Sequence, residues 1–345
     1  MKSNIPINEI AAGEDYRLMV LVTGAREKRT QQGALFVEAF TRNTTGNLLL
    51  KIRSEAMPEG APAITPGLWC VSGRAEMFQD RIQLVVADYQ PITLAEYREH
   101  LNADPVLPRA FTMDIETLAL PGFRERIGPQ LERRLRLGNM RMDQQQRYLE
   151  DIAAEEERCY QLGALGATSG RLLSLAVHVG PIPGLRFQGV EQIESEHVFG
   201  IDADGREQPE AEALTRWLNF MRDFDPETDE LVGHNIIAFD LPFIFQRCLV
   251  SGINARPLVD LGEYRVRGVF DTMHRWALGD RRARVSLDDL AWALGIASSK
   301  TDEVEGSKVF DLYQAGRLAE IREYNLNDVR VTRKIYERIV AAFGR

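Results

Sequence analysis

The arrangement of apolar residues changes once along this 345-residue chain, near residue 105, and the change limits the folds available to it. Before that point, short runs of β-branched and aromatic residues alternate with turn signals, without a long helical pattern. After it, strand-like runs alternate with longer segments of helical periodicity. We therefore expect two domains: an all-β domain with its linker over residues 1–104, and an α/β domain over residues 105–345.

The first block contains five short apolar runs that we expect to be strands. They lie at residues 16–22, 34–40, 47–52, 66–76 and 80–87, with turn signals between them. A short helix is expected at residues 94–100, and a connector with two prolines follows at 102–108. Five short strands without a long helix predict a small closed barrel.

The second block alternates strands and helices. The expected strands are residues 110–116, 171–179, 194–201, 230–233 and 269–271. The expected helices lie near residues 208–222, 240–250, 286–294 and 320–343. This order predicts a mixed central sheet flanked by helices, with an insertion at about 121–169 that begins basic and becomes acidic.

Composition places the chain among ordinary globular proteins. Apolar residues make up 44% of the chain and charged residues 27%. Three widely spaced cysteines favour neither a disulfide framework nor a zinc cluster. We find no apolar run of membrane-spanning length and no secretory signal, and expect a cytoplasmic protein that does not bind membranes. The net charge of −9 argues against an architectural nucleic-acid coat, although local basic surface can still bind a polyanion.

Two carboxylates lie two residues apart in a strand-like run. Asp114 and Glu116 alternate there with the apolar residues Met113 and Ile115. Residues i and i+2 of a strand point to the same face, so the two carboxylates lie side by side. Two anions in a partly dry site repel each other unless cations compensate them, which indicates a metal site.

Two further aspartates lie in short segments that complete the pattern. Asp240 follows a Gly-His-Asn turn, and Asp328 follows Tyr324 by four residues. Four carboxylates suit Mg²⁺ or Mn²⁺, and two such ions can activate a water and stabilise a leaving oxygen in phosphoryl transfer.

Each segment also has an ordinary structural interpretation. An Asp-x-Glu triplet often begins a solvated loop, and Asp240 could cap the helix after it. Asp328 could pair with Arg330 or Arg333 on a helix surface, and Tyr324 could be half-buried packing. Singly, these interpretations are favoured; together they require four coincidences in order.

The three segments resemble the exonuclease motifs of the DEDD superfamily, the RNase H-like 3′–5′ exonucleases. Residues 114–117 read Asp-Ile-Glu-Thr, residues 239–243 read Phe-Asp-Leu-Pro-Phe after Gly-His-Asn at 233–235, and residues 324–329 read Tyr-Asn-Leu-Asn-Asp-Val. Tyrosine four residues before the last aspartate is typical of the tyrosine subclass. The sequence is similar over about 109–340 to the proofreading domain of family-B DNA polymerases, and departs from it in the insertion.

The resemblance implies an RNase H-like exonuclease fold and catalysis with two divalent ions, Mg²⁺ or Mn²⁺. Asp114, Glu116 and Asp328 are then expected to hold the ion that carries the attacking water. Asp114 is expected to bridge to a second ion held by Asp240. Tyr324 is expected to orient the water through a hydroxyl that is protonated at neutral pH.

Other residues of the same segments are expected to contact nucleic acid. Asn235 would fix the terminal nucleotide, and Phe239 and Leu118 would stack on or wedge the last bases, beside Thr117. Asp271 is the main alternative carboxylate, and we interpret it as a cap for the helix that follows it.

The first block resembles an OB-fold over roughly residues 15–90, on the Thr-Gly turn at 45–46 and the Pro-Gly strand that starts at 66. One interpretation is a single-strand-binding surface with aromatic residues for stacking. The candidate aromatics are Phe36, Phe40, Trp69 and Phe78, and the candidate phosphate contacts are Arg26, Lys28, Arg29, Arg42, Lys51 and Arg53. The alternative is a docking module for a protein partner or a second copy of the chain.

We therefore expect a metal-dependent 3′–5′ exonuclease that hydrolyses phosphodiester bonds from the 3′ end of single-stranded DNA. The alternatives are an exoribonuclease of the same superfamily and a catalytically silent nucleic-acid-binding module. Exonucleases of this kind serve repair, recombination and antiphage defence, and the sequence does not choose among them. The insertion either lines the path of the strand or forms a solvated helical excursion.

Overall fold

The computed structural model describes residues 1–345 except 4, 31, 44, 57–62, 128–141, 186, 188–189, 191, 263–265, 281–282, 298–308 and 345. The chain forms two compact units, one of residues 1–109 and 180–193, the other of residues 110–179 and 194–345. The chain therefore passes between the units three times, because a segment between two strands of the second unit belongs to the first.

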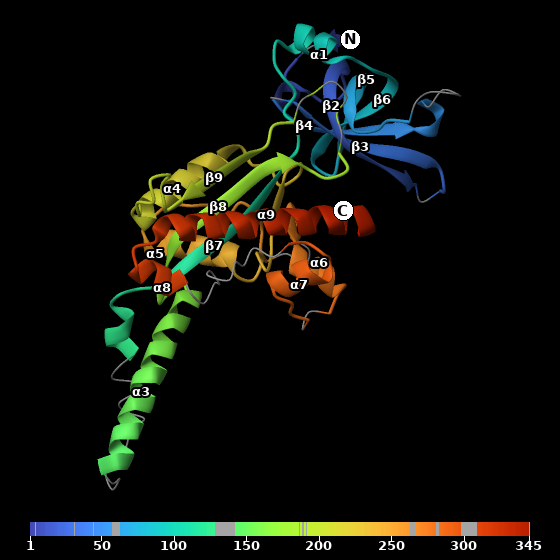
Figure 1. Ribbon diagram of the computed structural model, residues 1–345. Coiled ribbons are helices and arrows are strands. Elements are labelled where there is room, and N and C mark those ends of the chain that lie inside the picture. The colour runs from blue at the N-terminus through green and yellow to red at the C-terminus, as the bar shows by residue number, and fades with distance from the viewer. Residues whose placement is uncertain are drawn as a thin grey trace. The chain divides into compact units, whose positions relative to one another are not determined.

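The first unit is a closed barrel (Figure 1). Its strands are β1 (Lys2–Ser3), β2 (Asp15–Arg29), β3 (Leu35–Asn43), β4 (Gly46–Arg53), β5 (Gly67–Phe78) and β6 (Arg81–Pro91). They pair in the order β2-β3-β4-β6-β5, and β5 pairs again with β2 to close the barrel. The β4–β6 pair is parallel and the others around the ring are antiparallel, so the expected OB-type barrel is confirmed.

Two apolar clusters hold this unit together. Alternate residues of the strands fill the barrel, including the fully buried Tyr16, Val20 and Leu50. Outside it, helix α1 (Leu94–Leu101) begins with a capping box at Thr93. Phe187, from the segment 180–193, is buried with Tyr97 of α1 in the second cluster.

The second unit contains a mixed five-stranded sheet. Its strands are β7 (Arg109–Ala119), β8 (Gly170–Pro181), β9 (Ser195–Phe199), β10 (Glu230–Gly233) and β11 (Val269–Asp271). Their order is β11-β10-β7-β8-β9, with β7, β10 and β11 parallel to one another and β9 antiparallel to β8. The five expected strands and the mixed sheet are confirmed.

Helices cover both faces of this sheet (Figure 1). They are α3 (Met142–Leu162), α4 (Glu210–Phe220), α5 (Asp240–Val250), α6 (Thr272–Ala277), α7 (Leu287–Ala293), α8 (Val309–Gln314) and α9 (Leu318–Phe343). Apolar residues of α4 and α5 pack on one face with Met113 and Ile115 of β7. On the other face, α8 and α9 pack against Leu118 and Leu173.

Short 3-10 helices lie at Ile7–Glu9, Ser54–Ala56, Gly163–Leu165 and Met221–Asp223. The insertion contributes α3, which extends away from the sheet in Figure 1. Near its C-terminal end, the buried Tyr160 packs edge-to-face on Phe310, with ring centroids 5.7 Å apart, and lies under the guanidinium of Arg124. Residues 128–141, which hold much of the basic half of the insertion, lie outside the described residues.

Cys70, Cys159 and Cys248 are free thiols. Over the described ranges, no helix has the combination of length and apolar character needed to cross a bilayer.

Candidate active site

Strand β7 presents two carboxylates to the face of the sheet that α9 covers. Phe111, Met113 and Ile115 point to the α4–α5 side and join its apolar cluster. Asp114 and Glu116 alternate with them and therefore point the other way. By surface area both acids are half-buried, although protein atoms enclose them on most sides.

Helix α9 brings a third carboxylate and the tyrosine to the same place. Asp328 and Tyr324 are both buried and lie four residues apart, so they share one side of the helix. One carboxylate oxygen from each of Asp114, Glu116 and Asp328 lies within 4.8 Å of the other two. Three acids from a strand and a helix thus form one cluster, which we call the acidic trio.

Asp240 is the first residue of α5 and is only 3% exposed. It lies outside the acidic trio at that distance limit, but its charge contributes to the raised pKa of both Asp114 and Glu116. The backbone N–H of Ile115 donates to its carboxylate. The expected four carboxylates are therefore neighbours, with Asp240 slightly apart from the other three.

Burial and mutual repulsion dominate the electrostatics of the site. Burial, then the charges of Asp328 and Asp240, hold the pKa values of Asp114 and Glu116 well above their usual range. Burial also raises the pKa of Asp240 to about 7. Hard oxygen donors crowded in this way fit Mg²⁺ or Mn²⁺, because a bound cation offsets the repulsion that otherwise favours protonation.

Tyr324 is held as a neutral hydroxyl. Burial first, then the negative charges of Asp328 and Glu116, raise its pKa far above that of a free tyrosine. Its hydroxyl donates a hydrogen bond to Asp328, and its ring packs in the same cluster as Leu118. As a neutral hydroxyl, this residue can position a water through a hydrogen bond.

Asp271 organises the turn before α5. Its carboxylate accepts from the backbone N–H groups of Asn235 (3.1 Å) and Ile237 (3.2 Å). It also accepts from the N–H groups of Met273 (3.0 Å) and His274 (3.2 Å), which confirms the expected helix cap. With these bonds made, Asp271 is a structural acid of the site.

The turn itself is unusual at Asn235, which has a left-handed backbone with φ of 65°. Its side-chain Oδ1 is buried and has no hydrogen-bond partner among the described residues. Next to it, the ring of His234 is held at both nitrogens, by Thr272 Oγ1 (2.9 Å) and the carbonyl of Val285 (2.8 Å).

The other residues expected at nucleic acid differ in exposure. Phe239 and Thr117 are half-buried, and Phe239 packs on Phe243 with ring centroids 5.7 Å apart. Leu118 is 4% exposed and belongs to the cluster beneath Tyr324, so in this structure it supports the tyrosine and offers no surface to a base.

Two hydrogen bonds of the site were not predicted from the sequence. Asn325 donates to Asp114, and Ser174 of β8 donates to Asn325. The sequence offers one sign of Asn325, an amide between apolar residues of an amphipathic helix. It offers none for Ser174, which lies 151 residues away in the chain.

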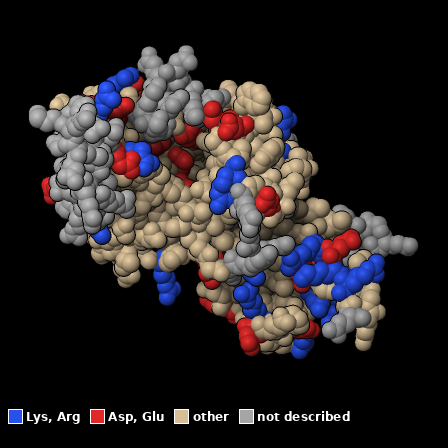
Figure 2. Space-filling model, turned by 90° about the horizontal axis from the view of Figure 1, so that it is seen from below, with Lys and Arg blue, Asp and Glu red and all other residues tan. Residues whose placement is uncertain are grey.

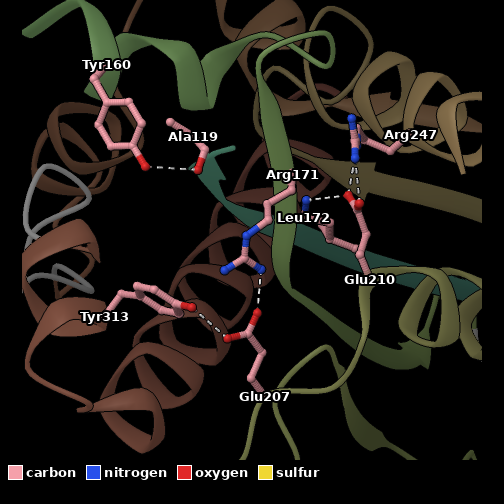
Figure 3. A network of polar contacts seen from close by, with 8 residues as sticks. All are labelled: Ala119, Tyr160, Arg171, Leu172, Glu207, Glu210, Arg247 and Tyr313. Carbon is pink, nitrogen blue, oxygen red and sulfur yellow. Dashed lines mark hydrogen bonds and ion pairs between the residues drawn. The ribbon is translucent and has the colours of Figure 1, made fainter. Parts of the chain in front are cut away.

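A separate polar network lies at the start of β8 (Figure 3). Glu210 accepts from the guanidinium of Arg247 (2.6 and 2.9 Å) and from the N–H of Leu172 (2.7 Å). Glu207 accepts from Arg171 and from the hydroxyl of Tyr313. Each acid in this network faces a cation.

The barrel carries a mixed-charge surface on β2, β3 and β4 (Figure 2). Arg26 lies over the ring of Phe40, and Lys51 lies over the rings of Phe36 and Phe78, at 4.8 to 5.7 Å from their centroids. Arg26 and Lys28 both pair with Glu38. Of the other candidates, Arg42, Phe36 and Trp69 are buried, whereas Phe78 is 51% exposed.

Comparison with known proteins matches both units. Residues 185–345 match a family described as predicted 3′–5′ exonucleases related to the exonuclease domain of PolB. The catalytic subunit of DNA polymerase delta from Arabidopsis thaliana is 33% identical over 136 residues, which are 38% of this chain and 10% of the relative. That from Schizosaccharomyces pombe is 31% identical over 123 residues, 35% of this chain and 10% of the relative.

Among solved structures, a domain of replication protein A from Methanococcus maripaludis is similar to the barrel. It is 16% identical, with a TM-score of 0.23, and the match covers 26% of this chain and 96% of that domain. The yeast Stn1–Ten1 complex matches 26% of this chain and 49% of that chain at 11% identity and a TM-score of 0.23.

The chain spans about a tenth of the length of the polymerase subunits that it matches. The sheet with its two helical layers fits the exonuclease domain of those enzymes. Residues 185–345 are thus similar to the predicted 3′–5′ exonucleases that are related to the exonuclease domain of PolB.

Proposed function

We propose that this protein is a metal-dependent exonuclease that removes nucleotides from the 3′ end of single-stranded DNA. The observation that carries the proposal is the acidic trio, in which oxygens of Asp114, Glu116 and Asp328 lie within 4.8 Å of one another. Burial and neighbouring negative charges raise the pKa values of Asp114 and Glu116, which supports a site where a cation offsets the repulsion. Divalent cations bound among these carboxylates would offset their mutual repulsion and so stabilise the site.

Each acid has a proposed part in holding metal. Asp114, Glu116 and Asp328 would hold one ion, and Asp240 with Asp114 would hold a second. When bound, such ions supply an activated water and stabilise the leaving oxygen of a phosphodiester. The protein contributes the fixed positions of the carboxylates and a half-buried setting that strengthens their electrostatic interactions.

Tyr324 is proposed to orient the attacking water. Its hydroxyl is protonated and donates to Asp328, so an oxygen lone pair remains to accept a hydrogen bond from water. Its ring is fixed by apolar neighbours, including Leu118. The residue then acts by position and not by taking a proton outright.

The substrate strand is proposed to end near the turn before α5. The Asn235 amide oxygen is suited to a hydroxyl or amino donor of the terminal nucleotide, and the half-buried Phe239 and Thr117 lie in the neighbouring segments. The barrel surface around Arg26 and Lys51 combines cations with aromatic rings, the pairing that holds single strands without sequence preference.

The test is a time course on a 5′-labelled single-stranded DNA with EDTA, Mg²⁺ or Mn²⁺, beside an RNA of the same sequence. A ladder that shortens from the 3′ end, only with metal and faster on DNA, is the expected result. Faster cleavage of the RNA would make the protein an exoribonuclease. Absence of hydrolysis on either strand with both metals would leave a nucleic-acid-binding module.

A further inference from the structure

Asp114 is held by a chain of two buried hydrogen bonds that leads away from the acidic trio. Asn325 Nδ2 donates to Asp114 Oδ2 at 2.7 Å, and Ser174 Oγ donates to Asn325 Oδ1 at 2.8 Å. Asn325 and Ser174 are both 0% exposed. The chain joins three elements of the second unit, β7, α9 and β8.

The serine fixes which end of the amide faces the carboxylate. An asparagine amide has a donor end and an acceptor end, and only the donor end attracts a carboxylate. Because Ser174 donates to the oxygen of Asn325, the NH₂ group is turned toward Asp114. A reversed amide would place its oxygen against a carboxylate oxygen, and two acceptors in contact repel each other.

From this geometry we infer that Asn325, oriented by Ser174, is a positioning residue that holds the Asp114 carboxylate ready for a divalent cation. The inference rests on the proposed function. One hydrogen bond to Oδ2 leaves the other oxygen of Asp114 free as a ligand, and it prevents the carboxylate from turning away from Glu116 and Asp328 before metal binds.

A neutral donor suits this place better than a charged one. A lysine or arginine would pair with Asp114 and compete with the cation for its negative charge. An aspartate would add a further anion beside the acidic trio. An amide orients the carboxylate without changing the net charge of the site, so the attraction for a cation is kept.

The experiment compares Mn²⁺ binding by calorimetry in the full-length protein and in the variant Asn325→Leu, which has similar side-chain size but no donor. We expect binding to weaken about 10- to 100-fold, the usual range for a group that orients a metal ligand. The Mn²⁺ concentration for half-maximal cleavage of single-stranded DNA should rise by the same factor, whereas the rate at saturating Mn²⁺ should recover to within a few-fold of wild type.

Two further variants separate positioning from general damage. Ser174→Ala removes one hydroxyl, keeps the helix intact and is expected to weaken Mn²⁺ binding less, by about 2- to 10-fold. In the double variant it should add nothing to Asn325→Leu, because both act through one chain of bonds. Asn327→Leu is the matched control, since Asn327 lies on the same helix and accepts from Arg330 instead.

The outcomes are distinct. Mn²⁺ affinity within two-fold of wild type in a folded Asn325→Leu protein overturns the inference and leaves the exonuclease proposal standing. If Asn325→Leu does not fold, unchanged affinity in Ser174→Ala overturns it instead. A wild-type protein that binds no Mn²⁺ overturns both.

Discussion

Acidic side chains in the second unit are held in two contrasting ways. Glu210, with 14% of its side chain exposed, is satisfied by the guanidinium of Arg247 and a backbone N–H. Asp114, Glu116 and Asp328 face one another, and burial together with the charge of Asp328 raises the pKa values of Asp114 and Glu116. The first arrangement is satisfied by a cation of the protein, whereas a bound divalent cation would offset the repulsion within the second.

The contrast separates acids that stabilise the fold from acids kept for chemistry. A buried carboxylate that is paired with a cation destabilises the fold strongly only when that cation is removed. A cluster of like charges weakens the fold in the absence of its ligand, and a protein keeps such strain where it serves function. The acidic trio therefore identifies the active site better than any one acidic triplet in the sequence does.

The largest effect is expected for activity at the acidic trio. Asp114→Asn keeps the size of the side chain and the bond to Asn325 but removes a charge, and we expect the cleavage rate to fall at least about 1000-fold, about 4 kcal/mol. Initial rates on 5′-labelled DNA at saturating Mn²⁺ measure it. Glu320→Gln, on an acid that pairs with Arg317 at the surface, is the control and should keep wild-type rates.

Breaking the buried pair of Arg247 and Glu210 is expected to affect stability more than activity. Arg247→Met leaves Glu210 without its cation in a buried place and should lower the free energy of unfolding by about 3–5 kcal/mol. Arg206→Met removes a pair whose arginine is 76% exposed and should change it by less than about 1 kcal/mol. Urea unfolding of the metal-free proteins gives both values, and equal losses would remove the distinction between the two kinds of site.

Stability without metal should improve when the trio loses a charge. In EDTA, Asp114→Asn is expected to raise the free energy of unfolding by about 1–2 kcal/mol, because repulsion with Glu116 and Asp328 falls. With Mn²⁺ present the order should reverse, since the wild-type protein gains more from binding. Thermal melts with and without Mn²⁺ test this, and a variant that is less stable than wild type in EDTA would contradict the repulsion.

Much of this contrast could be predicted from the sequence, and part of it could not. Backbone geometry alone predicts the side-by-side acids of β7 and the shared helix side of Tyr324 and Asp328. The meeting of Asp328 with the acids of β7 was expected only from the resemblance to the exonuclease motifs. The partners of single side chains depend on contacts across the fold. Leu118 was expected at the substrate but is buried in the core of the second unit. Phe187 lies, in sequence, between two strands of the second unit, yet it belongs to the first unit and is buried there.

The pH dependence of the metal-free protein distinguishes the two kinds of acid again. The pKa of Asp240 is raised to about 7, so the folded protein holds this proton more tightly than the unfolded chain does. Stability should therefore fall as pH rises from about 4 to 7, by about 1–3 kcal/mol, and stay low above pH 7. Unfolding in EDTA at pH 5 and pH 8 measures the difference.

Acids paired with arginine should show the reverse. A hydrogen bond from Arg330 lowers the pKa of Glu196, so its contribution is complete above about pH 4.5 and is lost as pH falls further. Between pH 5 and 8 the pair of Glu196 and Arg330 therefore adds no slope to the dependence of stability on pH. Asp240→Asn should therefore reduce the slope in that window, to which Asp114 and Glu116 contribute with the same sign, and an unchanged slope would mean that Asp240 does not cause it.

The smallest effect is expected on the barrel, where opposite charges meet in solvent. Glu38 pairs with Arg26 and Lys28, whose side chains are 56% and 40% exposed, so Glu38→Gln should change stability by less than about 1 kcal/mol. If this surface holds the strand, the same change releases two cations for phosphates and should tighten DNA binding a few-fold at low salt. Fluorescence anisotropy with labelled single-stranded DNA and Asp114→Asn as the uncleaving background measures it.

Asp15→Asn, whose acid pairs with Arg74 at 3.7 Å outside this surface, controls for the loss of one negative charge. Equal tightening in both variants would mean that the DNA senses only the overall charge, and the mixed-charge surface would then have no special part in holding it.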